Sequence, residues 1–194
     1  MQDRDQARFS DKLCAVFGEC HRVLKDDGLM VFSYHHSRDD GWTSVAAAVL
    51  HAGFRLVQAQ PVKAEMSVAM PKLAAKSPID LDVLMVCRKA AGDRRRPSES
   101  ADALKTAEQE AGYKVLRFNR TGRRLSLNDV RIIVFSQALV ELCAGRGTED
   151  ALNAFASALG DCQTIAQRLF DRQDAHARQP VAPSRTTPIQ ASLF

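Results

Sequence analysis

Two adjacent histidines, His35 and His36, are the side chains of this sequence best placed for chemistry. They follow the apolar run 29–34, which predicts a strand covered on both faces, and doubly wound sheets bind ligands at the carboxyl ends of such strands. We therefore expect both imidazoles to line a ligand pocket. No other His, Cys or carboxylate stands at ligand spacing, so no metal site is predicted. Alternatively, one histidine closes a turn and the other is solvated.

Two further side chains are candidates for contacting the same ligand. Trp42 begins the next predicted helix, and its ring can stack on a planar ligand, although packing against the sheet is the role that we favour. Glu65 follows Pro61 in an irregular segment. A loop glutamate is usually solvated, so its candidacy depends on its position in the resemblance described below.

Arginines concentrate in the middle of the chain. Between residues 88 and 124 eleven Lys and Arg stand against five acids, whereas the net charge of the whole chain is only +4. Such a cluster can neutralise phosphates and bind DNA in a salt-dependent way, with Tyr113 and Phe118 as stacking groups. The alternative is a solvated linker. The candidate DNA-binding residues are Arg94, Arg95, Arg96, Arg117, Arg120, Arg123 and Arg124.

The composition is that of a globular protein with one domain, or one domain and an appendage. The chain has 194 residues, 45% of them hydrophobic and 26% charged. No apolar run approaches the roughly 20 residues that span a bilayer, and the N-terminus does not resemble a secretory signal. Five scattered cysteines without a CxxC pair argue against a disulfide framework. We therefore predict a cytoplasmic protein without a membrane partner.

The first 90 residues have the pattern of an α/β segment. Ser10 is expected to cap a first helix, and Gly28 to end it with a left-handed turn. The following elements are a strand at 29–34, a helix at 42–51, and strands at 54–59 and 81–87. This order predicts half of a doubly wound sheet.

The rest of the chain is predicted to be helical. Ser126 followed by Asp129 indicates a helix start, and 101–111, 148–159 and 161–170 have helical patterns, whereas 113–118 is ambiguous. We divide the chain into an α/β segment at 1–90, a basic connector at 91–124, a helical region at 125–172 and a disordered tail at 173–194.

A resemblance to a known family rests on a set of short motifs. They are Val23-Leu24-Lys25-Asp26-Asp27-Gly28-Leu29-Met30-Val31-Phe32-Ser33-Tyr34-His35-His36, Gly41-Trp42, Ala46-Ala47-Ala48-Val49-Leu50, Ala52-Gly53-Phe54 and Pro61-Val62 with Glu65. Together they resemble the C-terminal half of a class I S-adenosylmethionine-dependent methyltransferase, and most closely a bacterial adenine-specific DNA methylase. The resemblance implies a partial Rossmann-like sheet of C-terminal strands followed by an all-α appendage. It also implies that His35, His36, Trp42 and Glu65 contact the extruded substrate adenine.

Two motifs of that family are absent from this sequence. There is no Gly-rich loop that would hold the cofactor and no Asp/Asn-Pro-Pro-Tyr loop that would hold the target amine. We therefore assign no catalytic residue and expect the chain alone to bind no S-adenosylmethionine, although the complete restriction-modification enzyme would use it. The strand at 29–34 would then lack a neighbour, and its open edge would pair with a missing N-terminal half or with a second copy. A truncated, inactive product is a third possibility.

The last five residues, 190–194, suggest a different partner. They look like the peptide by which bacterial replication and repair proteins dock on the DNA polymerase sliding clamp, with Gln190 as a polar handle and Leu193 and Phe194 as apolar anchors. This resemblance, together with the arginines, gives the alternative function: a non-catalytic DNA- or clamp-binding module on a methyltransferase-fold remnant.

Overall fold

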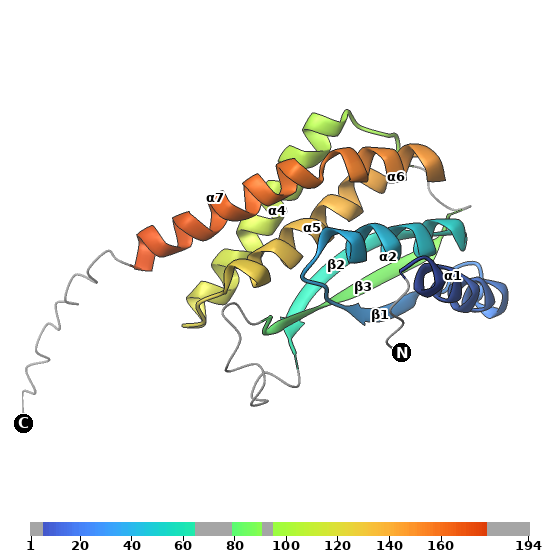
Figure 1. Ribbon diagram of the computed structural model, residues 1–194, viewed down its shortest axis with the longest axis horizontal. Helices are drawn as coiled ribbons and strands as arrows, with labels where there is room; N and C mark the ends of the chain where they lie inside the picture. The colour runs from blue at the N-terminus through green and yellow to red at the C-terminus, as the bar shows by residue number, and fades with distance from the viewer. Residues whose placement is uncertain (1–5, 65–78, 91–94, 178–194) are drawn as a thin grey trace, which may run out of the picture.

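The computed structural model describes residues 6–64, 79–90 and 95–177, and over these ranges the chain is a mixed α/β protein (Figure 1). The α/β class predicted from the sequence is confirmed. The described elements are α1 (Gln6–Val23), β1 (Met30–Tyr34), α2 (Asp39–His51), β2 (Phe54–Lys63), β3 (Leu81–Lys89), α4 (Ser100–Arg120), α5 (Leu127–Cys143), α6 (Thr148–Ser157) and α7 (Leu159–Ala177).

The three strands form one sheet in the order β1-β3-β2. β3 runs antiparallel to both neighbours, with Phe32 opposite Met85 on one side and Ala59 opposite Met85 on the other. β1 and β2 are therefore parallel to each other, joined through α2 and separated by β3. The adjacent strands of a doubly wound sheet are parallel, so the neighbour relations differ from those of the predicted half-sheet.

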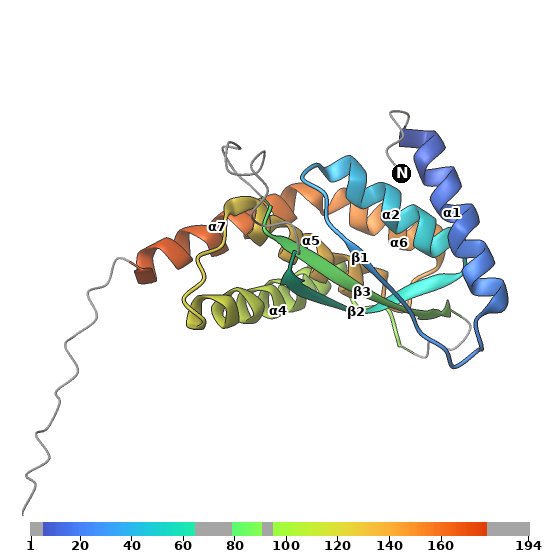
Figure 2. The same cartoon turned by 90° about the horizontal axis from the view of Figure 1, so that it is seen from below.

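The described helices lie on one side of the sheet, and Figure 2 shows the opposite face turned toward the viewer. On the helix side Phe17 of α1 packs on Phe32 with 5.0 Å between ring centroids, and alternate residues of β3 are buried. On the other face, Val31 of β1 is 54% exposed. The expectation that 29–34 is covered on both faces is therefore wrong, because no described helix crosses this second face.

One hydrophobic core joins the α/β segment to the later helices. Buried side chains form a single cluster from Phe17 in α1 to Leu169 in α7. The whole of α4 lies within the predicted connector 91–124; the helix is continuous through the ambiguous stretch 113–118 and packs along α5. The predicted tail is also shorter at its start, because residues 173–177 belong to α7 and Gln173 is buried. The other tail residues lie outside the described ranges.

Two local predictions about α1 are wrong, for physical reasons. Ser10 lies inside the helix, which begins at Gln6, and its hydroxyl donates to the carbonyl of Ser44 at 3.5 Å. Gly28 does not have a positive φ. Its lack of a side chain instead allows a close approach, since a Cβ there would lie 2.7 Å from the Cγ of Leu24.

The helix start at Ser126 and Asp129 is confirmed. Ser126 caps α5, accepting from the backbone N–H of Asp129 at 3.1 Å, and the Asp129 carboxylate accepts from the backbone N–H of Ser126 at 3.0 Å. The same carboxylate reaches across to the sheet. Its Oδ1 accepts from the backbone N–H groups of Asp80 and Leu81, at 2.8 and 3.1 Å. Asp129 thus ties the start of β3 to the start of α5.

None of the described helices has a sufficiently long apolar stretch to cross a bilayer.

The cysteines give a prediction about thiol reactivity. Burial raises the pKa of Cys87, Cys143 and Cys162 to about 12. Because the thiolate is the reactive form, we expect these three to resist a chromogenic disulfide reagent near neutral pH in the folded protein. Cys14 and Cys20 are half-buried and should react first. Titration without and with denaturant checks this, and rapid reaction of all five thiols in the folded state would contradict the described packing.

Candidate ligand site at the carboxyl end of β1

His35 lies just beyond β1 and pairs with a carboxylate of the neighbouring strand. Its Nδ1 contacts the Oδ1 of Asp82, which stands near the start of β3. The imidazole is 44% exposed and the carboxylate side chain 25% exposed. In the neutral imidazole whose proton is on Nδ1 and faces Asp82, the other ring nitrogen, Nε2, is a hydrogen-bond acceptor. The pair is therefore an oriented imidazole at the carboxyl end of β1.

His36 has a different role, because it closes the turn that follows. Its Nδ1 lies 3.2 Å from the backbone nitrogen and 3.0 Å from the backbone oxygen of Arg38. Its ring lies directly over Gly41, where an added Cβ would come within 2.2 Å of the imidazole. Glycine is therefore required at 41 for the close approach, and the two adjacent histidines do not face one pocket in the same way.

Trp42 is buried in the core under the same turn. None of its surface is exposed, and its indole N–H donates to the backbone oxygen of His36 at 3.0 Å. Its ring packs edge-on against Tyr34 with 5.2 Å between centroids, and lies 5.9 Å from Phe135 of α5. In this arrangement the side chain orders the histidine turn by packing, the role favoured from the sequence, and it offers no free ring face to a ligand.

The start of α2 is held by two other helices. Asp39, in the first turn of α2, accepts from a guanidinium nitrogen of Arg131 in α5 at 3.3 Å and from the side-chain amide of Gln163 in α7. Acidic residues in a first turn also face the positive end of the helix dipole. The turn from 35 to 41 is thus anchored at its far end to the helical layer.

Tyr34 gives the turn a pH dependence. Its hydroxyl donates to the backbone oxygen of Gly41 at 2.7 Å, and burial, with a smaller contribution from the charge of Asp40, raises the pKa of the phenol above its usual value. The neutral phenol therefore contributes stability that is fully present below the unfolded-state pKa of about 10. This contribution is lost as the pH rises from that value through the higher pKa of the folded state.

We therefore expect the stability advantage of the native protein over Tyr34→Phe to shrink between about pH 8 and about pH 11. Urea unfolding of both proteins at several pH values measures it. The comparison at each pH is internally controlled, because the other groups titrate equally in the native protein and in the phenylalanine variant. An advantage that stays constant or grows with pH would contradict the assigned burial of the phenol.

The candidate DNA-binding arginines fall into two groups. Arg95 and Arg96 precede α4, and a guanidinium nitrogen of Arg95 donates to the backbone oxygen of Leu56 at 3.2 Å. Arg117, Arg120, Arg123 and Arg124 are at the other end of α4, a helix of 21 residues and therefore about 30 Å long. The structure does not bring the two groups together into one patch.

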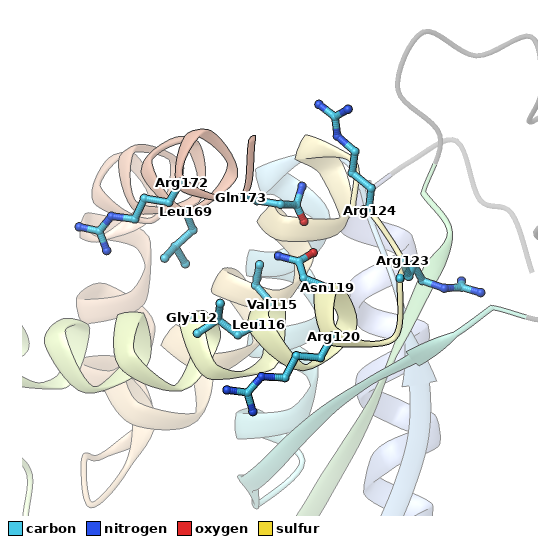
Figure 3. A pocket seen from close by; sticks show the side chains of 11 residues that line it. Gly112, Val115, Leu116, Asn119, Arg120, Arg123, Arg124, Leu169, Arg172 and Gln173 are labelled. Carbon is cyan, nitrogen blue, oxygen red and sulfur yellow. The ribbon is translucent and has the colours of Figure 1, made fainter. Parts of the chain in front are cut away.

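Three arginines of the second group, Arg120, Arg123 and Arg124, border a hollow that could not be expected from the sequence. We call it the arginine-rimmed pocket; it has a volume of about 760 Å³ and lies between the end of α4, the turn into α5, and α7 (Figure 3). It is lined by Gly112, Val115, Leu116, Asn119, Arg120, Gly122, Arg123, Arg124, Leu169, Arg172 and Gln173. The approach of α4 to α7 that forms it depends on contacts between residues far apart in sequence, which periodicity alone does not specify.

Several predicted residues lie outside the described ranges. They are Glu65, Arg94, Gln190, Leu193 and Phe194. Within the described part of the chain, no group of three or more His, Cys, Asp or Glu side chains is placed to hold a metal ion.

No family model, curated protein or solved structure matches this chain.

Proposed function

We propose that this chain is the substrate-side part of an S-adenosylmethionine-dependent, adenine-specific DNA methyltransferase, and that a second polypeptide segment supplies the cofactor-binding half. The observation that carries the proposal is the open edge of β1, whose carboxyl end holds the oriented His35. In this proposal β1 and β2 are the parallel strands of a partial Rossmann-like sheet, α2 is their crossover helix and β3 is an antiparallel strand between them.

The open edge has the properties of an unfinished sheet. Among the described residues β1 pairs with β3 alone, so its other edge presents backbone groups without a strand partner. Leu29 and Val31 are 47% and 54% exposed, although both are apolar. On α1, which packs over β1 through Phe17, Val16 and Val23 are also exposed. A further strand on this edge would satisfy the backbone groups and could bury part of the apolar surface.

The chemistry of the proposed role is recognition rather than methyl transfer. The Nε2 of His35 can accept a hydrogen bond from the exocyclic amine of an extruded adenine, because Asp82 engages Nδ1. When bound to the partner half, S-adenosylmethionine would supply the methyl group. His36 and Trp42 act by shaping the turn that carries His35.

The proposal is tested first by the coding sequence upstream of Met1 and by cofactor binding. We expect a Gly-rich loop and an Asp/Asn-Pro-Pro-Tyr motif to be encoded there, in frame or in an adjacent reading frame. Calorimetry should show no S-adenosylmethionine binding to this chain alone and binding once the two parts are combined. Absence of both motifs upstream, or tight cofactor binding by the chain alone, would overturn the proposal.

The assembly itself is tested at the strand edge. Val31→Lys places a charge on the exposed side of β1 without touching the described core, and it should weaken association with the cofactor half in light-scattering experiments. Gln58→Lys, at an exposed position of β2 on the far side of β3, is the control. Self-association of this chain through β1 in place of binding to the other half would instead support a second copy as the partner and would contradict the proposal.

The arginines at the end of α4 favour a second candidate, a non-catalytic DNA-binding module. Four of them, at 117–124, lie within eight residues of sequence at and just after the C-terminal end of α4. Duplex DNA binding that weakens steeply with salt, and is lost when these arginines are replaced by alanine, would support this function. No binding at either low or moderate ionic strength would exclude it.

Docking on the sliding clamp through Leu193 and Phe194 is a separate proposal. Deletion of these two residues tests it by clamp pull-down.

A further inference from the structure

We propose that the arginine-rimmed pocket is a binding site for a small amphipathic anion, that is, a compact apolar body carrying a carboxylate or phosphate group. This inference goes beyond the proposed methyltransferase role, because the pocket lies in the helical layer and shares no residue with the turn at His35.

The floor of the pocket is apolar. Val115 and Leu169 are 3% and 7% exposed, whereas Leu116 is 49% exposed at the pocket wall. Figure 3 shows the aliphatic side chains of these residues facing the hollow from α4 and α7. The volume of about 760 Å³ is within the range of ordinary ligand pockets, roughly 300–1,000 Å³. An aliphatic ligand could therefore displace water from Leu116 and the floor together.

The hollow has a defined wall. Gly112 faces Leu169 of α7, and a Cβ at this position would contact the Cδ2 of Leu169 at 3.6 Å. A larger side chain at 112 would therefore occupy part of the hollow. Gln173, which is 5% exposed, holds α7 against the turn into α5: its side-chain amide donates to the backbone oxygen of Leu125 at 2.9 Å, and its Oε1 accepts from the backbone N–H at 3.2 Å. The two walls are thus joined by a buried pair of hydrogen bonds.

The rim is positively charged. Among the side chains that the structure describes, four arginines line the pocket and no aspartate or glutamate does. Within the described residues, the guanidinium groups of Arg120 and Arg123 make no hydrogen bond or ion pair, and Figure 3 shows the four guanidinium groups spread around the opening. Arginine side chains are long and rotate freely at the surface, so they can turn toward an anion seated at the mouth.

The combination of floor and rim selects the ligand class. A neutral apolar compound would leave the arginines without an anionic partner. Inorganic phosphate would leave the apolar floor in contact with water. Single-stranded nucleic acid is disfavoured because the pocket lining, as far as the chain is described, contains no aromatic side chain for base stacking. Duplex DNA presents phosphates without a protruding apolar group, so it would contact the rim only.

The test is calorimetric titration of the whole chain with octyl phosphate, alongside 1-octanol and inorganic phosphate as controls. We expect one octyl phosphate per chain, with an affinity at least about tenfold greater than that of either control, which corresponds to about 1.4 kcal/mol. Equal affinity for octyl phosphate and either control would overturn the proposal. So would binding of duplex DNA through Arg120 and Arg123 without binding of octyl phosphate.

Variants locate the site. Arg120→Ala with Arg123→Ala, and separately Leu116→Asp, should each weaken octyl phosphate binding by at least about fivefold. Arg96→Ala with Lys105→Ala removes the same charge from exposed positions outside the pocket, and it should change the affinity for octyl phosphate less than about twofold.

Gly112→Leu is a second approach, because it adds volume to the pocket wall at a helix position where leucine is favoured over glycine. It should reduce binding, while the unchanged fluorescence of Trp42 shows that the fold is intact. Equal binding by the native protein and by all three pocket variants would contradict the assignment.

Discussion

Replacing Asp129 by alanine is expected to lower the free energy of unfolding by about 3 kcal/mol or more. The carboxylate is 2% exposed and accepts from three backbone N–H groups, those of Asp80, Leu81 and Ser126. An alanine would leave these donors without their acceptor where little water can reach, and each buried unsatisfied donor costs about 1–3 kcal/mol. The loss would uncouple the start of β3 from the start of α5.

Graded variants separate the two functions of Asp129. Ser126→Ala removes only the helix cap and should cost about 1 kcal/mol, whereas Asp129→Asn keeps one acceptor oxygen and should fall between the two. Asp102→Ala, an exposed first-turn acid of α4, is the matched control and should change stability by no more than about 0.5 kcal/mol. Urea unfolding followed by Trp42 fluorescence measures all four. If Asp129→Ala lowered the free energy of unfolding no more than Ser126→Ala does, the hydrogen bonds from Asp129 to β3 would contribute nothing to stability.

Replacing Trp42 by alanine is expected to cost about 3–5 kcal/mol. Its indole is fully buried between Tyr34 and Phe135, so truncation would leave a large cavity at the junction of β1, α2 and α5. Since natural domains are stable by only about 5–15 kcal/mol, this variant would be close to unfolding. Far-UV circular dichroism during urea unfolding measures it without needing the tryptophan.

Trp42→Phe separates packing from the hydrogen bond to His36. It retains an aromatic ring but loses the N–H donor, and it should cost less than the alanine variant, about 1–2 kcal/mol. If Trp42 instead served a ligand, Trp42→Ala would leave the unfolding free energy nearly unchanged and weaken only ligand binding. Stability is therefore the measurement that decides between its two roles.

Local features of the fold could be predicted from the sequence because they depend on neighbours in the chain. The capping pair Ser126 and Asp129 and the positions of the three strands follow from spacing and side-chain type. The order β1-β3-β2 could not be derived, because the antiparallel insertion of β3 beside β1 depends on pairing across 49 or more residues. The left-handed turn predicted at Gly28 is wrong because a glycine can serve close packing as well as a left-handed φ.

The candidate site shows the same limit. The sequence singled out His35 and His36 together, but their environments differ because Asp82 comes from another strand and Gly41 from a helix start. The register of β1 and β3, which alone brings Asp82 to His35, is set by tertiary packing. The arginine-rimmed pocket likewise needs α7 beside α4, and Gln173 lies in a segment that composition assigned to the tail.

The central claim is that β1 joins this chain to a cofactor-binding half and that His35 then faces the substrate adenine. The most direct measurement is transfer of a radiolabelled methyl group from S-adenosylmethionine to adenine in duplex DNA, by the chain combined with the polypeptide encoded upstream. We expect transfer by the combination and none by the chain alone. We also expect at least about a tenfold loss with His35→Ala and little change with His51→Ala, a half-exposed histidine at the far end of α2. No transfer by the combined protein, or equal transfer by both histidine variants, would contradict the central claim.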